Sequence, residues 1–166
     1  MASKDIQQFA DAATAVLRAM WDSNSPYREE LEKRERKGGY LCVSLYDGNP
    51  LVITPVGQPD LTIGHELIRD CQMEARLLAI HESHTRSSKC PSHDRSFNGA
   101  AVRGESYIIS FSWVHRELSE ILCAMVLYAL ADTEREALAD LLAGNDLASP
   151  HAIQFLVNAL ESAYKR

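Results

Sequence analysis

The sequence lacks any long apolar segment. A membrane-spanning helix needs about 20 consecutive, mostly uncharged residues, and charged side chains interrupt every window of that length in this chain of 166 residues. The first six residues also lack the basic region and apolar core of a secretory signal. We therefore expect a cytoplasmic protein without a membrane partner.

An excess of basic residues is absent too. Lysine and arginine total 17 against 23 aspartate and glutamate residues, which gives a formal net charge of −6. A nucleic-acid groove is typically basic, often with aromatic side chains between the cations, and no such cluster occurs in the sequence. Nucleic acid is therefore not an expected partner.

The sequence also lacks a CxxC pair and the common catalytic motifs. Without CxxC spacing, its cysteines form neither a thioredoxin-type centre nor a four-cysteine zinc site. Three of the four lie in apolar periodic segments, where a thiol acts as a small hydrophobic side chain, so free thiols are favoured over disulfides. There is no GxSxG elbow, P-loop or GxGxxG motif, so we assign no catalytic residue and favour a non-enzymatic protein. The cysteines are Cys42, Cys71, Cys90 and Cys123.

The sequence does contain the apolar periodicity that is typical of amphipathic helices. Apolar residues recur at helical spacing from Asp5 to about Trp21, and again from Leu67 to about His81. A helix that starts at Ser25-Pro26 is expected to end at Gly38-Gly39. The segment 118–130 is apolar over so wide an arc that it should form the central, most buried helix.

Two β-hairpins are predicted between these helices. The first turns at Asp47-Gly48-Asn49, and the second has a two-residue turn at Gly104-Glu105. Ser112, at the end of the second hairpin, is positioned to cap the helix that follows. The four expected strands span 40–46, 51–53, 100–103 and 106–112.

Residues 133–166 complete the chain with two further helices. Thr133 and Glu136 have the spacing of a capping box, Gly144 is a stop signal, and Ser149-Pro150 starts the last helix. The order of elements is therefore ααββα, a loop, then ββααα. Because hairpins pair in antiparallel fashion, we predict a single domain of the α/β (α+β) class. In this three-layer sandwich, helices flank an antiparallel sheet of two hairpins.

A polar, His-rich segment separates the two halves of this pattern. Residues 82–98 contain Pro91 and have no periodicity, and a loop of this length in a compact domain is often functional. His81-x-x-His84 and Cys90-x-x-His93 supply the nitrogen and sulfur donors that zinc prefers. His81, His84, Cys90 and His93 are therefore candidate metal ligands, in a zinc-dependent enzyme or a zinc-stabilised domain.

The middle of the chain, about 31–130, resembles the GlcG/HbpS-like haem-binding (haem-degrading-like) family. The resemblance is carried by GGYLCVSLYDGNPLVITP, HELIRDCQMEARLLAI and VRGESYIISFSWVHRELSEI. It implies a profilin-like α/β/α sandwich and a ligand-binding tendency, with haem as one ligand. The family's Lys-Ala-x-Thr-Ala signature is replaced here by the segment 74–79, and its glycine after the last strand by Trp113, so the family's functional positions do not carry over.

Three functions follow as hypotheses. The first is a small-ligand binding or sensing domain, with haem as one candidate ligand. Its pocket is expected between the sheet and the loop 82–98, with His65, His81 and His84 as contacts. The second is the zinc protein described above. The third is a homodimer or higher homo-oligomer with a structural role. Its candidate interface residues are Trp113, Tyr128 and Tyr164.

Overall fold

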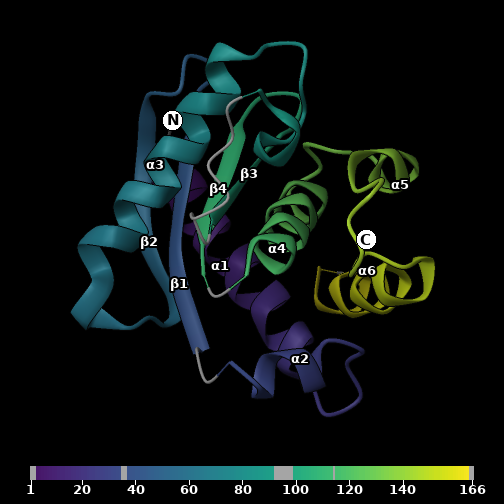
Figure 1. The fold of residues 1–166 in the computed structure, drawn as a ribbon. Coiled ribbons are helices and arrows are strands. Elements are labelled where there is room, and N and C mark those ends of the chain that lie inside the picture. Colours follow the sequence, from purple (N-terminus) through teal and green to yellow (C-terminus); the bar gives the residue numbers. More distant parts are fainter. Residues whose placement is uncertain (1–2, 35–36, 92–98, 114, 165–166) are drawn as a thin grey trace.

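The sheet has four strands in the order β2-β1-β4-β3, and all neighbouring strands are antiparallel. The computed structural model describes residues 3–34, 37–91, 99–113 and 115–164. Both predicted hairpins form, and the pairing of β1 with β4 joins them into one sheet (Figure 1). The strands are β1 (Lys37–Ser44), β2 (Pro50–Gln58), β3 (Gly99–Arg103) and β4 (Ile108–Ser112).

Helices cover both faces of this sheet. Helix α3 (Gly64–Ile80) lies on one face, while α1 (Ser3–Trp21) and α4 (Arg116–Ala129) pack on the other (Figure 1). Helix α6 (Pro150–Tyr164) packs against α1 and α4 on the side away from the sheet. The predicted mixed α/β class, an antiparallel sheet with flanking helices, is confirmed. The short helices are α2 (Arg28–Glu32) and α5 (Leu138–Leu141), with 3-10 turns at Leu61–Ile63, Ser87–Lys89 and Arg135–Ala137.

The main hydrophobic core lies between the sheet and α4. Strand residues alternate between the two faces, and those that face α4 are large and apolar: Leu41, Val43, Ile109 and Phe111 are all fully buried. Every residue of α4 from Leu118 to Ala129 is buried, which confirms the prediction of a central helix. The opposite face of the sheet carries small residues beneath α3, including Cys42, Ser44, Ser110 and Ser112.

The two glycines expected to end the second helix lie instead within β1. Helix α2 is a single short turn that stops at Glu32. A Cβ at Gly39 would lie 2.0 Å from the backbone oxygen of Ser112, and one at Gly38 would lie 2.2 Å from the oxygen of Val56. The glycine pair therefore permits close pairing of β1 with its two neighbours, and the prediction of a helix stop was wrong.

Other boundaries also differ from the predictions. Strand β2 continues to Gln58, past the point at 53 where the predicted strand ended. His115, not Ser112, is the N-cap of α4, and its side chain makes no capping bond. The predicted capping box fails as well, because the 3-10 turn after Glu134 has no side-chain cap. The final helix behaves as predicted, since the Ser149 hydroxyl accepts a hydrogen bond from the Ala152 N–H at 3.2 Å.

Among the described residues, no helix is both long and apolar enough to cross a membrane.

Leu122→Ala tests the assignment of the core. Leu122 is 0% exposed on α4, so the substitution should lower the free energy of unfolding by about 2–5 kcal/mol through lost burial and the cavity left behind. Urea denaturation followed by circular dichroism measures the change. Leu61→Ala is the control, because Leu61 is 78% exposed and its loss should change the free energy by less than about 0.5 kcal/mol. Equal effects of the two substitutions would contradict the packing.

Candidate functional site

The first part of the predicted His-rich loop is ordered along the outer edge of β3. Arg86 forms an isolated antiparallel bridge with Val102. The Arg103 N–H donates to the Thr85 oxygen at 2.8 Å, and the Ala101 N–H donates to the Ser87 hydroxyl at 2.8 Å. These bonds occupy backbone donors that an edge strand otherwise leaves open. Thr85 and Arg86 are thereby held beside the sheet.

A buried ion pair then ties this segment to α4. The Arg86 guanidinium lies 2.9 Å from the Glu120 carboxylate, and the two side chains are only 7% and 4% exposed. Glu120 also accepts hydrogen bonds from the Ser88 hydroxyl and, at 3.0 Å, from the Asn145 amide. Removal of two charges from water costs free energy that close pairing and further hydrogen bonds must offset. Glu120 has such partners from two separate segments of the chain.

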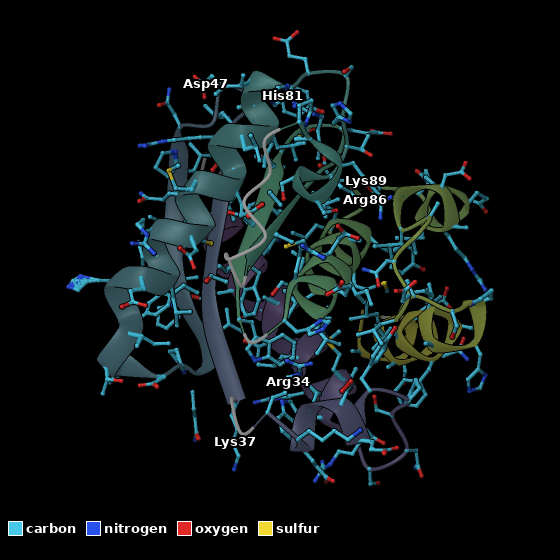
Figure 2. The ribbon with its side chains drawn as sticks, viewed as in Figure 1. Arg34, Lys37, Asp47, His81, Arg86 and Lys89 are labelled. Atoms are coloured by element: carbon cyan, nitrogen blue, oxygen red, sulfur yellow. The ribbon has the colours of Figure 1, made fainter. Side chains whose placement is uncertain are left out.

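The same arginine also positions the chain after α5. Its second terminal nitrogen donates to the Ala143 oxygen, and the Asn145 amide donates to the Glu117 oxygen at 3.0 Å. Arg86 and Lys89 lie on the side of the molecule nearest α5 (Figure 2). This network, which we call the Arg86–Glu120 network, connects the loop, α4 and the end of α5.

Asp132 holds the β3–β4 turn. The residue is only 8% exposed, and its carboxylate accepts the backbone N–H of Ser106 at 3.0 Å and that of Tyr107 at 3.2 Å. Its backbone oxygen accepts the Glu105 N–H at 3.0 Å. On the other side of the turn, the Tyr46 hydroxyl donates to the Glu105 oxygen at 2.6 Å. The turn is therefore held from both sides.

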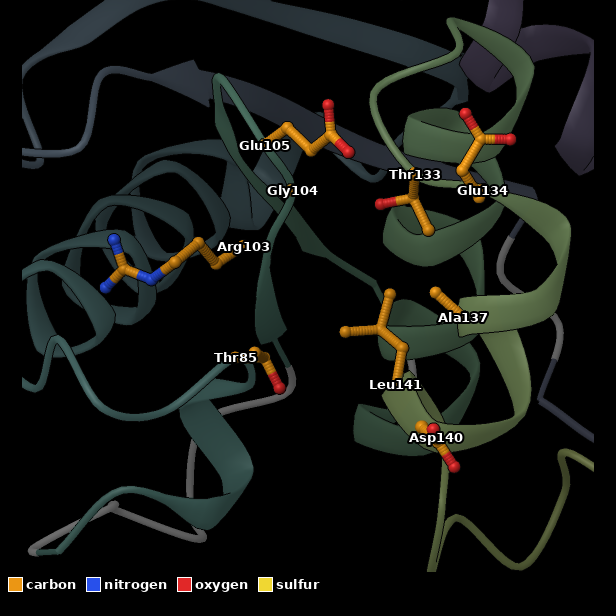
Figure 3. Close-up of a pocket in the computed structure, with 9 residues that line it drawn as sticks. All are labelled: Thr85, Arg103, Gly104, Glu105, Thr133, Glu134, Ala137, Asp140 and Leu141. Atoms are coloured by element: carbon orange, nitrogen blue, oxygen red, sulfur yellow. The ribbon is translucent and has the colours of Figure 1, made fainter.

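Between this turn and the segment 133–141 lies a cavity of about 330 Å³, the turn pocket (Figure 3). Glu105 and Thr133 extend into the gap between the two walls, and Ala137 and Leu141 contribute apolar surface. Glu134 lies at the same end of the pocket as Glu105, and Asp140 lies toward the other end (Figure 3). The full lining is Thr85, Arg103, Gly104, Glu105, Thr133, Glu134, Ala137, Asp140 and Leu141.

The charge around the turn pocket is predominantly negative. Glu105, Glu134 and Asp140 are exposed carboxylates. The guanidinium of Arg103 is directed away from the gap (Figure 3); it donates to backbone oxygens near the C-terminal end of α3 and lies 4.9 Å from the Tyr46 ring centroid. Its charge is therefore engaged in holding the wall, which leaves a pocket suited to a cation.

A second cavity of about 320 Å³ lies between α5 and α6, with Leu138, Ile153 and Val157 in its lining. All of its lining residues come from the single stretch 135–157. The turn pocket differs because three distant segments build it and because carboxylates stand next to apolar surface. For these reasons we take the turn pocket as the candidate functional site.

The three histidines predicted to contact a ligand do not form one site. His65 is exposed in the first turn of α3. His81 caps the last turn of that helix, at its other end (Figure 2). At 1.5 Å per residue, a helix of this length separates them by about 25 Å. His81 and His84 do lie together, with ring centroids 6.2 Å apart. Neither lines the turn pocket, although His84 directly precedes Thr85 in its wall.

The predicted zinc ligands are brought together only in part. Cys90 is buried beside Ala75, Leu78 and Ala101. Burial, together with the charge of Glu74, raises the pKa of its thiol to about 11, although zinc requires the thiolate. His93 lies outside the described residues. Within the part of the chain that the structure describes, no group of three or more histidine, cysteine or acidic side chains could hold a metal ion.

Two of the three aromatic residues predicted at an oligomer interface are buried inside the chain. Trp113 is 0% exposed and Tyr128 is 5% exposed. The Trp113 ring packs at 6.0 Å from that of Phe111, and the Tyr128 hydroxyl donates to Glu161 at 3.0 Å. Neither offers surface to a partner, so their assignment to an interface was wrong. The side chain of Tyr164 lies outside the description.

The sequence did contain a signal for the network that was missed. Glu120 is a carboxylate within an otherwise apolar helical stretch, and a buried carboxylate requires a partner. Its partner Arg86 is 34 residues away, so no local pattern connects them. Asp132 lies between the predicted helix 118–130 and the predicted capping box at Thr133, and no sequence pattern assigned it a role.

Comparisons of the chain with protein-family models, with curated proteins and with solved structures gave no match. The resemblance to the GlcG/HbpS-like family therefore stays a prediction from its motifs. The candidate site depends on the geometry described above.

Glu120→Gln tests the Arg86–Glu120 network. Because it leaves the buried Arg86 cation without its counter-charge, we expect the free energy of unfolding to fall by about 3–5 kcal/mol, measured by urea denaturation at neutral pH. Glu32→Gln is the matched control. It breaks a 2.7 Å pair with Arg28, but those side chains are 57% and 40% exposed, and exposed pairs contribute about 1 kcal/mol or less. Similar losses for both substitutions would contradict the assigned role.

Proposed function

We propose that this protein is a small-ligand binding or sensing domain and that the turn pocket takes a compact organic cation, such as a primary amine attached to an apolar group. The observation that carries the proposal is the pocket itself, a cavity of about 330 Å³ whose lining combines apolar side chains with three acidic residues, Glu105, Glu134 and Asp140. That volume lies at the small end of the range of about 300–1,000 Å³ found for ligand pockets.

The two chemical halves of the lining suit the two halves of such a ligand. The methyl and isobutyl groups of Ala137 and Leu141 offer a surface for an apolar group. The carboxylates of Glu105, Glu134 and Asp140 accept hydrogen bonds from an ammonium group. The formal net charge of −6 also favours the approach of cations over anions.

The walls support binding because they are held before a ligand arrives. Asp132 and Tyr46 hold the turn through backbone hydrogen bonds, and the Arg86–Glu120 network holds Thr85 and the chain after α5. A preformed site avoids much of the entropy cost of ordering loops on binding.

Haem and zinc remain proposals from the sequence and involve other residues, because His65, His81, His84 and Cys90 do not line the turn pocket. Hemin titration followed by absorbance separates the haem proposal from the amine proposal. A shift of the Soret band that is lost in His81→Ala and His84→Ala would support a haem site apart from the pocket. No shift, or one that both variants retain, would remove those histidines as haem ligands.

Titration with benzylamine tests the turn pocket, with benzyl alcohol as the neutral probe of the same shape. Backbone amide shifts in NMR spectra should concentrate at Glu105, Thr133 and Ala137, and benzylamine should bind more tightly than the alcohol. Combined replacement of the three carboxylates by amides should weaken benzylamine binding about tenfold, since each exposed charge contributes only a fraction of a kcal/mol.

The control is Glu29→Gln, which removes a carboxylate from α2 that is exposed and outside the pocket; it should leave the dissociation constant unchanged. Leu141→Trp should block both probes by filling the floor. Equal affinity for the amine and the alcohol, or shifts centred on Ile153 and Val157 in the α5–α6 cavity, would overturn the proposal.

A further inference from the structure

Two cysteines lie beside the same serine, Ser110, in the layer between α3 and the sheet. Cys42 is on β1, Cys71 is on α3, and both are 0% exposed and present as free thiols. Cys42 lies opposite Ser110 in the pairing of β1 with β4, and Cys71 Sγ lies 3.4 Å from the hydroxyl of that same serine. The sequence showed only that they are 29 positions apart without a CxxC motif; the packing of α3 on β1 brings them together.

The immediate surroundings of these two sulfur atoms are polar. The Ser44 hydroxyl lies 3.4 Å from Cys42 Sγ, and the Ser110 hydroxyl lies 3.4 Å from Cys71 Sγ. Cys71 Sγ also lies 3.3 Å from the backbone oxygens of Tyr40 and Ser110. Small polar residues thus surround both sulfur atoms where a core usually has apolar side chains.

We propose that Cys42 and Cys71 form a dithiol that hydrogen peroxide oxidises to a disulfide, which locks α3 onto β1. The hydrogen bond from Cys71, assisted by Ser44, Ser110 and the charge of Arg76, lowers the pKa of Cys42 to about 7 although burial opposes this shift. Burial raises the pKa of Cys71 well above its usual value. Cys42 is therefore the nucleophile and Cys71 the resolving thiol.

The reaction proceeds in two balanced steps. The Cys42 thiolate attacks one oxygen of the peroxide, the O–O bond breaks, and the leaving hydroxide takes a proton to become water. Cys71 sulfur then attacks the sulfenic sulfur, the S–O bond breaks, and the leaving hydroxide takes the Cys71 proton as a second water. Two thiols are oxidised and one peroxide is reduced. Because both sulfur atoms are buried, a small oxidant and a transient opening of α3 are needed.

Peptide mapping of peroxide-treated, folded protein tests the pairing directly. Trypsin cleavage after lysine and arginine separates all four cysteines, with Cys42 in 38–69, Cys71 in 70–76, Cys90 in 90–95 and Cys123 in 117–135. Under non-reducing conditions, we expect 38–69 to be linked to 70–76, with an intact mass lower by two hydrogen atoms and restored by dithiothreitol. Amide hydrogen exchange in α3 should slow by at least about tenfold after oxidation, because the crosslink restricts its opening.

The variants provide matched controls. Cys42→Ser and Cys71→Ser should each abolish the link, whereas Cys90→Ser and Cys123→Ser should retain it, since Cys123 faces the opposite side of the sheet within the α4 core. The wild-type map decides the question even if a variant fails to fold. Linkage through Cys90 or Cys123, addition of oxygen to cysteine without a crosslink, or a link that forms only in urea would overturn the proposal.

Discussion

The buried ion pair between Arg86 and Glu120 is the interaction on which the candidate site depends. Glu120 lies in the middle of the most buried helix, where an unpaired carboxylate is strongly unfavourable. Its charge is compensated by a guanidinium from the segment before β3 and by donors from Ser88 and Asn145. One buried charge thus draws two distant segments onto α4, and these segments carry or adjoin the walls of the turn pocket.

The two faces of the sheet have different physical roles. The face toward α4 is built from large apolar side chains such as Phe111 and Ile109, and its burial supplies most of the driving force for folding. The face toward α3 carries serines and a cysteine, whose small volume lets the helix approach closely. That closeness brings Cys71 beside Ser110, which lies opposite Cys42 in the sheet, and so forms the layer in which we propose the dithiol.

Much of the fold followed from local patterns. Both hairpins and the four long helices were predicted because apolar periodicity and turn residues act over a few positions. The predictions failed where one local pattern is compatible with two structures. Gly38-Gly39 is typical of a helix end, but in the structure the two glycines allow the close pairing of strands. Likewise, Thr133 and Glu136 have the spacing of a capping box, yet the chain there makes a 3-10 turn and the short α5.

The sequence by itself determined the class of fold and the order of its elements, because hydrophobic periodicity and turn chemistry are properties of neighbouring residues. Only the tertiary structure decided the site. It buried Trp113, joined Arg86 to Glu120, and brought Cys42 and Cys71 beside the same serine. Such contacts link residues about 30 positions apart. They arise from the packing of the loop on α4 and of α3 on the sheet, and a local pattern cannot encode them.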